Sequence, residues 1–286
     1  MTDLQVRRPR FDFTGDIPFV WNPERPAFSF AMNATSILAI GFEQMIVEEA
    51  TAFLKQEAQH SSSHRKHVMA LIRRHPGLQQ VFDDAMSYFD DLTPSTSLEF
   101  RLAYVADLEA TFTPSFKLVL DNDDILFRPG DDRVASLFLW HFVEEVEHRS
   151  SALVIYDAVV GNPWYRMRVL PRVVKHMLGG LELIADGVNA HLPFEDRRVD
   201  ARSLLPSYGF EHAVKRLRGR TEPKAPPPFQ GVPLREKVVA GVRVLLSQTP
   251  FHDPAEDRLP AFADDWFRRW DDGGDVTQWY GAAVAG

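Results

Sequence analysis

Length, composition and charge limit the classes of protein to which this chain can belong. With 286 residues, 45% of them apolar and 25% charged, it has the composition of a soluble globular protein of one or two domains. A net charge of −8, without a basic stripe rich in aromatic residues, argues against nucleic acid as a partner. The absence of cysteine excludes disulfides, thiolate-bound metals and thiol nucleophiles.

Signals of membrane association and export are also missing. No apolar run reaches the roughly 18 residues of a membrane span, and "MTDLQVRRPRFDF" at the start has no apolar signal-peptide core. We therefore expect no membrane partner. Because the composition fits any compartment, a cytoplasmic location is the default expectation.

The first half of the chain is rich in helix-forming residues. Residues 1–30 contain four prolines and no helical period, which predicts an extended arm. From Ser36 to Arg74 the only glycine is Gly41 and there is no proline, so this stretch favours helix until "RRHPGL" ends it. We expect a short helix in "LQQVFDDAMSYFDD" and a longer one over 98–120, kinked at Pro114.

The second half continues the helical pattern and then becomes rich in proline. The acidic "DNDDILFRPGDD" is typical of a loop, and helices are expected over 132–160 and 165–190. After residue 190 we expect a polyproline-like strap at Pro226–Pro228 and short helices over 209–218, 234–247 and 260–271. No alternating strand pattern persists, so the fold class is all-α: an arm at 1–30, a helical bundle at 31–190 and a C-terminal helical wrap at 191–286.

Two copies of Glu-x-x-His stand out among the helical segments. Glu57 and His60 form the first copy, and Glu145 and His148 form the second. Residues three apart lie about 60° apart on a helix, so each pair can bind one metal ion. One copy is a weak signal. Two copies on apolar helices match the dinuclear carboxylate bundles, which add one glutamate from each of two other helices, and their ligands suit iron or manganese.

The two additional glutamates must come from other helices. Glu109 lies in the middle of an apolar helical segment, and Glu43 follows the strongly apolar "ILAIGF". However, Glu43 and Glu57 are only 57 − 43 = 14 residues apart. On one continuous helix their carboxylates would be separated by about 21 Å, and "QMIVEEATAFLKQ" has no turn-forming residue. Either a hairpin has been lost, a segment is absent, or Glu43 is no ligand; Glu48 and Glu49 are weaker substitutes.

The other polar residues considered along the chain divide into two groups. His64, one turn after the first motif, is expected to be a further ligand or a group behind the ligands. His141 and Glu144 are expected to orient ligands from behind. The other group is predicted to lie on helix surfaces or turns: His67, Glu147, His176, Glu182, Asp186, His252 and Asp253.

Several stretches resemble the "predicted metal-dependent hydrolase" group of ferritin-like bacterial proteins. They are "FDFTGDIPFVWNPERPAFSFAMNATS", "FLKQEAQHSSSH", "LAYVADLEATFT" and "HFVEEVEHRSSALVIYD", which together cover roughly residues 10–160. The resemblance implies a ferritin-like bundle with a dinuclear metal centre. The family usually places about thirty residues between its first glutamate and the Gln-Glu-x-x-His motif, and this chain departs from that spacing.

Three functions fit these observations. The first is a di-iron enzyme that uses O2 to oxidise a small organic substrate, with two iron ions, or manganese or zinc, in a pocket lined by Phe53, Phe112, Phe116, Trp140 and Phe142. The second is a metal-dependent hydrolase that uses a metal-bound hydroxide. The third is an iron-handling or interaction protein with an incomplete site. A homodimer is possible in each case.

Overall fold

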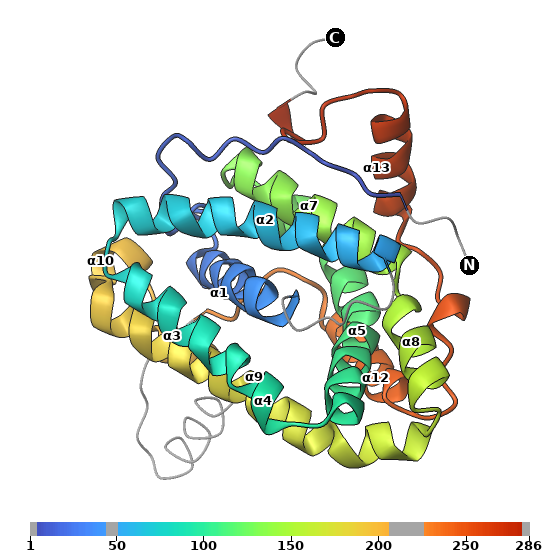
Figure 1. Ribbon diagram of the computed structural model, residues 1–286. Coiled ribbons are helices and arrows are strands. Elements are labelled where there is room, and N and C mark those ends of the chain that lie inside the picture. Colours follow the sequence, from blue (N-terminus) through green and yellow to red (C-terminus); the bar gives the residue numbers. More distant parts are fainter. Residues whose placement is uncertain (1–4, 44–50, 206–225, 282–286) are drawn as a thin grey trace.

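The computed structural model describes residues 5–43, 51–205 and 226–281 (Figure 1). All regular elements in these ranges are helices, which confirms the all-α prediction. The α-helices are α1 (Pro26–Glu43), α2 (Thr51–Arg74), α3 (Leu78–Asp90), α4 (Leu92–Ser95), α5 (Leu98–Leu120), α6 (Asp123–Phe127), α7 (Asp132–Glu147), α8 (Ser151–Val159), α9 (Pro163–His191), α10 (Phe194–Arg197), α12 (Leu234–Ser247) and α13 (Ala261–Asp271). Two short 3-10 helices are η1 (Ala201–Leu204) and η2 (Pro254–Glu256). No helix in these ranges is long and apolar enough to cross a membrane.

Several helices begin at the capping residues that the sequence provides. The side chain of Ser97 accepts a hydrogen bond from the backbone N–H of Phe100 at the start of α5, and Asp131 caps α7 in the same way. Asn162 caps α9, whose first residue is a proline. The predicted helix over 98–120 is confirmed, with Pro114 inside it.

The segment from Ser36 to Arg74 is two antiparallel helices rather than one. α1 ends at Glu43, α2 begins at Thr51, and the two helices pack along each other. Ser36 Oγ is hydrogen-bonded to Nδ1 of both His64 and His67, while Glu43, later in α1, lies near His60, earlier in α2, so the two helices run in opposite directions. The predicted arm ends earlier than residue 30 because α1 begins at Pro26, whose fixed φ suits the first turn of a helix.

Further boundaries in the second half differ from the predictions. The helix expected over 132–160 is divided into α7 and α8, because His148 leaves helical geometry as the C-cap of α7. The expected acidic loop contains α6. The helices expected over 234–247 and 260–271 correspond to α12 and α13, and the one expected over 209–218 lies outside the described residues. The proline-rich segment reaches α1, where the Phe229 ring packs against Phe28.

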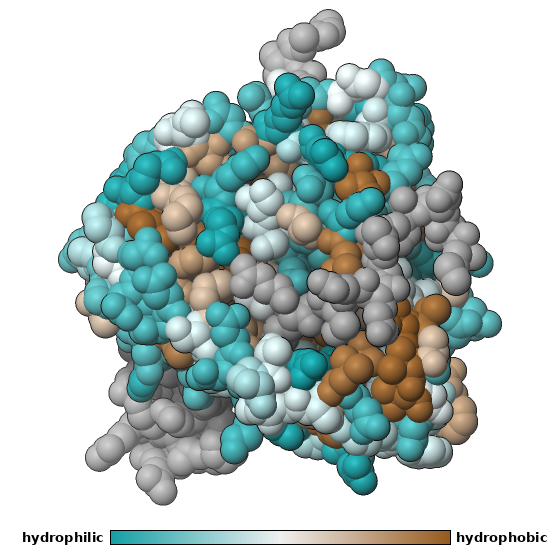
Figure 2. All heavy atoms as spheres, viewed as in Figure 1, coloured by the Kyte–Doolittle hydropathy of each residue, from teal (hydrophilic) through white to brown (hydrophobic). Residues whose placement is uncertain are grey.

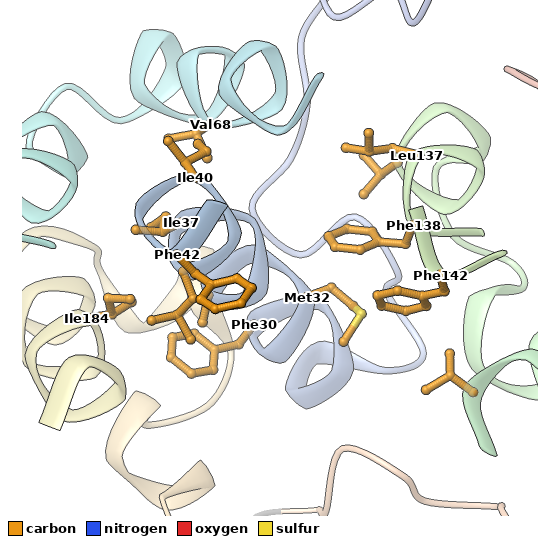
Figure 3. Close-up of a cluster of buried hydrophobic side chains, with 14 of the residues drawn as sticks. Phe30, Met32, Ile37, Ile40, Phe42, Val68, Leu137, Phe138, Phe142 and Ile184 are labelled. Carbon is orange, nitrogen blue, oxygen red and sulfur yellow. The ribbon is translucent and has the colours of Figure 1, made fainter. Parts of the chain in front are cut away.

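The core lies between the helices that surround α1. α1 packs against α2, α3 and α9, while α7 packs against α2 and α5. Figure 3 shows apolar side chains of α1 such as Ile40 and Phe42 at the centre, with Phe138 and Phe142 of α7 on one side and Ile184 of α9 on the other. This arrangement brings one polar stripe from each of α1, α2, α5 and α7 to the same interior region.

Candidate metal centre

Four helices bring histidine and glutamate side chains together in the interior. Two groups have ligand atoms that all lie within 4.8 Å of one another. The first group is Glu43, His60, His141 and Glu145, and the second is Glu57, His60, Glu145 and His148. His60 and Glu145 belong to both groups, so the two groups form one cluster.

Glu109 of α5 lies at the edge of this cluster, with Oε2 3.7 Å from Nδ1 of His148. Glu43 is 6% exposed, and the other members, Glu109 included, are at most 3% exposed. An isolated buried carboxylate is strongly disfavoured unless it is paired with a cation or binds a metal. This degree of burial therefore needs compensating positive charge.

Contacts within the cluster follow the two Glu-x-x-His motifs. Nε2 of His148 lies 3.1 Å from Oε1 of Glu57, on the other motif. Nδ1 of His60 lies 3.7 Å from Oε2 of Glu57 and 3.5 Å from Oε1 of Glu145. The two motifs thus face each other across the α2–α7 contact.

Many polar atoms of the cluster form no hydrogen bond. They include both carboxylate oxygens of Glu57 and Glu109, one oxygen each of Glu43 and Glu145, Nδ1 of His60 and both ring nitrogens of His148. Buried polar groups in folded proteins are almost always hydrogen-bonded. Carboxylate oxygens and imidazole nitrogens are also the ligand atoms that iron, manganese and zinc accept. The residues therefore fit a metal centre.

The pKa values within the cluster differ strongly between its glutamates. Burial and the carboxylates of Glu57 and Glu145 raise the pKa of Glu43 well above its ordinary value, and the same causes raise the pKa of Glu109. Burial also opposes ionisation of Glu145, but His148 and His141 outweigh it and hold its pKa well below the ordinary value. The carboxylates compete for positive charge, and bound cations would relieve this competition.

His60 is oriented by a carboxylate and an arginine outside the cluster. Its Nε2 lies 3.0 Å from Oε2 of Glu144, which leaves Nδ1 turned toward the other ligands. Nη1 of Arg7 donates to Oε1 of Glu144 at 3.1 Å and to Oε2 of Glu147 at 2.7 Å. The prediction that Glu147 points to solvent is therefore wrong, because it pairs with the buried Arg7. Arg7 was not expected from the sequence. A signal was present, because the two acidic residues Glu144 and Glu147 on one core-facing helix require a cation near them.

His64 lies behind His141, which is a member of the cluster. Nε2 of His64 lies 2.7 Å from Nδ1 of His141, and Nε2 of His141 lies 2.8 Å from Oε1 of Glu145. Since Ser36 occupies the other nitrogen of His64, His141 is the histidine that faces the cluster and His64 orients it. His67 also binds Ser36 and is fully buried, so the prediction of a surface position was wrong.

Glu43 joins the cluster despite its short spacing from Glu57. Its Oε1 lies 3.5 Å from Nε2 of His141. The separation of about 21 Å expected on one helix does not apply, because α1 and α2 are antiparallel. Glu48 and Glu49, the substitutes considered from sequence, lie outside the described residues.

Aromatic rings enclose the cluster, and the other polar residues singled out from sequence lie elsewhere. The ring centroid of Phe53 lies 4.9 Å from that of His148, and Trp140 lies 5.0 Å from His60. Phe116 stacks on Phe142 at 4.0 Å and on Phe112 at 4.9 Å. The outlying residues are His176, which binds Tyr104, Asp186, which binds Arg202, and Asp253, which caps η2.

The fold and the cluster define a class: an all-helical protein with a buried glutamate and histidine site suited to metal ions. The family model described as "Predicted metal-dependent hydrolase" matches residues 5–203, so the chain belongs to this family. The matched range includes the whole cluster and Arg7. No curated protein and no solved structure matches the chain.

Proposed function

We propose that this chain is a ferritin-like dinuclear metal enzyme that binds two iron ions and uses O2 to oxidise a small organic substrate. Two overlapping ligand groups support two metal ions. Four buried glutamates also carry together the four negative charges that offset two divalent cations in a region of low dielectric. The two Glu-x-x-His motifs and two further glutamates are the ligand set of the di-iron carboxylate bundles.

The contacts suggest how the ligands divide between two ions. Glu57, Glu109 and His148 would hold one ion, and Glu43 and His141 would hold the other. Glu145 directs Oε1 toward His141 and Oε2 toward His148, which suits a bridging carboxylate. His60 has a single nitrogen left for a metal because Glu144 occupies Nε2. The remaining histidines and Arg7 hold these ligands in orientation.

The burial of the cluster is the single observation that favours O2 chemistry. Its members are almost inaccessible to solvent, and aromatic rings surround them. A small apolar molecule such as O2 can enter such a site, while a polar ester, amide or phosphate would lose its hydration on entry. Bound iron would supply the electrons that reduce O2, and a carboxylate-rich ligand set stabilises the oxidised metal. The side chains of the chain itself fix the ligands and exclude water.

A metal-dependent hydrolase is the second candidate, because the family description names that activity. The same ligands would hold a metal that activates water for attack on an ester, amide or phosphate. A hydrolase works with redox-inert zinc and without oxygen, whereas the proposed oxidase needs iron and O2. This difference separates the two candidates without knowledge of the natural substrate.

The test begins with metal-free protein loaded anaerobically with Fe(II) and then exposed to O2. The proposal expects about two iron ions per chain, O2 consumption and a ferric absorption band. The variant Glu145→Ala, which removes the shared ligand, should lose both signals. Iron that binds without O2 uptake, together with hydrolysis of model esters by the zinc form, would favour the hydrolase. Uptake of many ferric ions per chain would instead indicate iron handling.

A further inference from the structure

α12 (Leu234–Ser247) exposes a row of large aliphatic side chains to solvent. Six of them are between 42% and 73% exposed: Leu234, Val238, Val239, Val242, Leu245 and Leu246. At about 100° per residue, all six lie within an arc of about 140° on the helix surface. We call this arc the α12 apolar face.

The opposite side of α12 packs against α5. The partly buried residues of the helix before its last turn are Lys237, Ala240 and Val244. At the N-terminal end Asn122 donates a hydrogen bond of 2.8 Å to Glu236, and just beyond the C-terminal end Gln248 donates one of 3.2 Å to the carbonyl of Asp107. α12 is therefore fixed antiparallel along α5. Its apolar face points away from α5, and no described element covers it.

Two exposed aromatic rings lie close to the C-terminal end of α12. Phe251 is 87% exposed and Trp164 is 63% exposed, and their ring centroids are 6.4 Å apart. On the face drawn in Figure 2, apolar side chains also gather in the region where Figure 1 draws α8. Contiguous apolar patches of more than a few hundred Å² are uncommon on monomers and mark interaction sites.

We propose that a second copy of this chain covers the α12 apolar face, with the two α12 helices packed antiparallel about a two-fold axis. The exposed aliphatic and aromatic side chains offer on the order of 800 Å², which is about what one partner contributes to a standard interface. Val238, Val242 and Leu245 are spaced four and three residues apart, as in the seam of two packed helices.

The face is complementary to itself under a two-fold axis. Gly241 lies near the middle of α12, about 20° outside the apolar arc, and no atom lies within 4 Å of the position that its Cβ would occupy, so this edge of the face has room for a second helix. Arg235 lies within the apolar arc at the N-terminal end. In an antiparallel pair it lies beside the C-terminal end of the other α12, whose last turn has no basic residue to offset the partial negative charge of its carbonyls.

Charge favours a second copy over a lipid surface. Peripheral membrane helices are rich in lysine and arginine around their apolar face. Here Arg235 lies inside the arc and Lys237 and Arg243 flank it, but the whole chain has a net charge of −8, which opposes binding to anionic lipid. A symmetric contact needs no such positive rim.

The test measures the mass of the full-length, metal-loaded protein by sedimentation over a wide concentration range. The proposal expects a species of two 32.6 kDa chains. Val242→Arg and Leu245→Arg should each weaken association by roughly tenfold or more. Because both side chains are exposed, the thermal midpoint measured on the single-chain species should stay unchanged. Phe194→Arg is the matched control, since Phe194 is 54% exposed in α10, away from α12 (Figure 1), and should leave association intact.

A charge variant separates this packing from unspecific apolar contact. Arg235→Glu should weaken association, and added salt should reduce the difference from the wild type. A wild-type protein of single-chain mass throughout would overturn the proposal. So would a two-chain species that persists in Val242→Arg, or a single chain that binds phosphatidylserine vesicles or another protein through this face.

Discussion

Oε1 of Glu43 lies 3.5 Å from Nε2 of His141, and this contact joins the end of α1 to α7 inside the cluster. In the proposed dinuclear site, this contact predicts that Glu43 would hold one of the two ions. We expect Glu43→Gln to lower the metal content from about two ions to about one per chain. Elemental analysis of purified protein measures this change.

Glu99→Gln is the control for that experiment, because Glu99 is an exposed helix residue on α5. It should keep the full metal content. Two ions retained by Glu43→Gln would show that Glu43 is a neighbour of the site and not a ligand.

The two Glu-x-x-His motifs could be predicted because their spacing alone places each pair on one helical face. Glu57 and His60 needed no knowledge of tertiary structure, and neither did Glu145 and His148. Glu109 followed from its apolar neighbours on a single helix. In these cases the residues on which the prediction depends lie within a few positions of one another on the same helix.

The remaining parts of the site depend on relationships between helices. Glu43 reaches the cluster because α1 and α2 are antiparallel, although the intervening sequence has no turn-forming residue. Whether His64 or His141 faces the cluster depends on how α7 is rotated against α2. Arg7 contacts a residue 137 positions away, and no local pattern predicts such a pairing.

Because His141 faces the cluster and His64 lies behind it, we expect their alanine variants to differ in metal binding. Because His141 faces the cluster, we expect His141→Ala to lose one of the two ions. His64→Ala removes the group that orients His141, so it should keep both ions at saturation but weaken metal affinity by roughly 10-fold to 100-fold. Competition with a chelator of known affinity measures both effects. Loss of an ion in the His64 variant alone would reverse the assignment.

At Gly41, where α1 packs against α3, there is little space for a larger side chain. A Cβ at this position would lie 2.6 Å from Cδ2 of the buried Phe89 and 2.9 Å from its Cγ. We expect Gly41→Ala to lower the free energy of unfolding by about 1–3 kcal/mol, although alanine is the better helix former. Denaturant unfolding of the metal-free protein measures it without a contribution from the site. An unchanged or higher stability would mean that Phe89 moves aside at little cost.

Metal removal should destabilise the protein because it leaves four glutamates close together in the core. We expect the chelated form to lose about 2.7 kcal/mol relative to protein with free metal at a hundredfold excess over the dissociation constant. For a chain of this size that corresponds to a decrease in Tm of roughly 4–5 °C. Calorimetry with and without chelator measures the difference, and restored metal should recover the original Tm. An unchanged Tm would indicate that the cluster does not bind the added metal.

Arg7 predicts a coupling between the N-terminal arm and the metal site. Its guanidinium pairs with Glu144, which in turn orients His60, and it lies 4.8 Å from the ring centroid of Phe267 in α13. Arg7→Ala removes the cation that pairs with Oε1 of the buried Glu144, so we expect a loss of about 3–5 kcal/mol in stability and weaker metal binding. Arg8→Ala is the matched control, because Arg8 is exposed and should change neither quantity. Arg7→Lys keeps the charge but loses the two-pronged pairing, and should give an intermediate metal affinity. Equal affinities in all three variants would show that the arm does not orient His60.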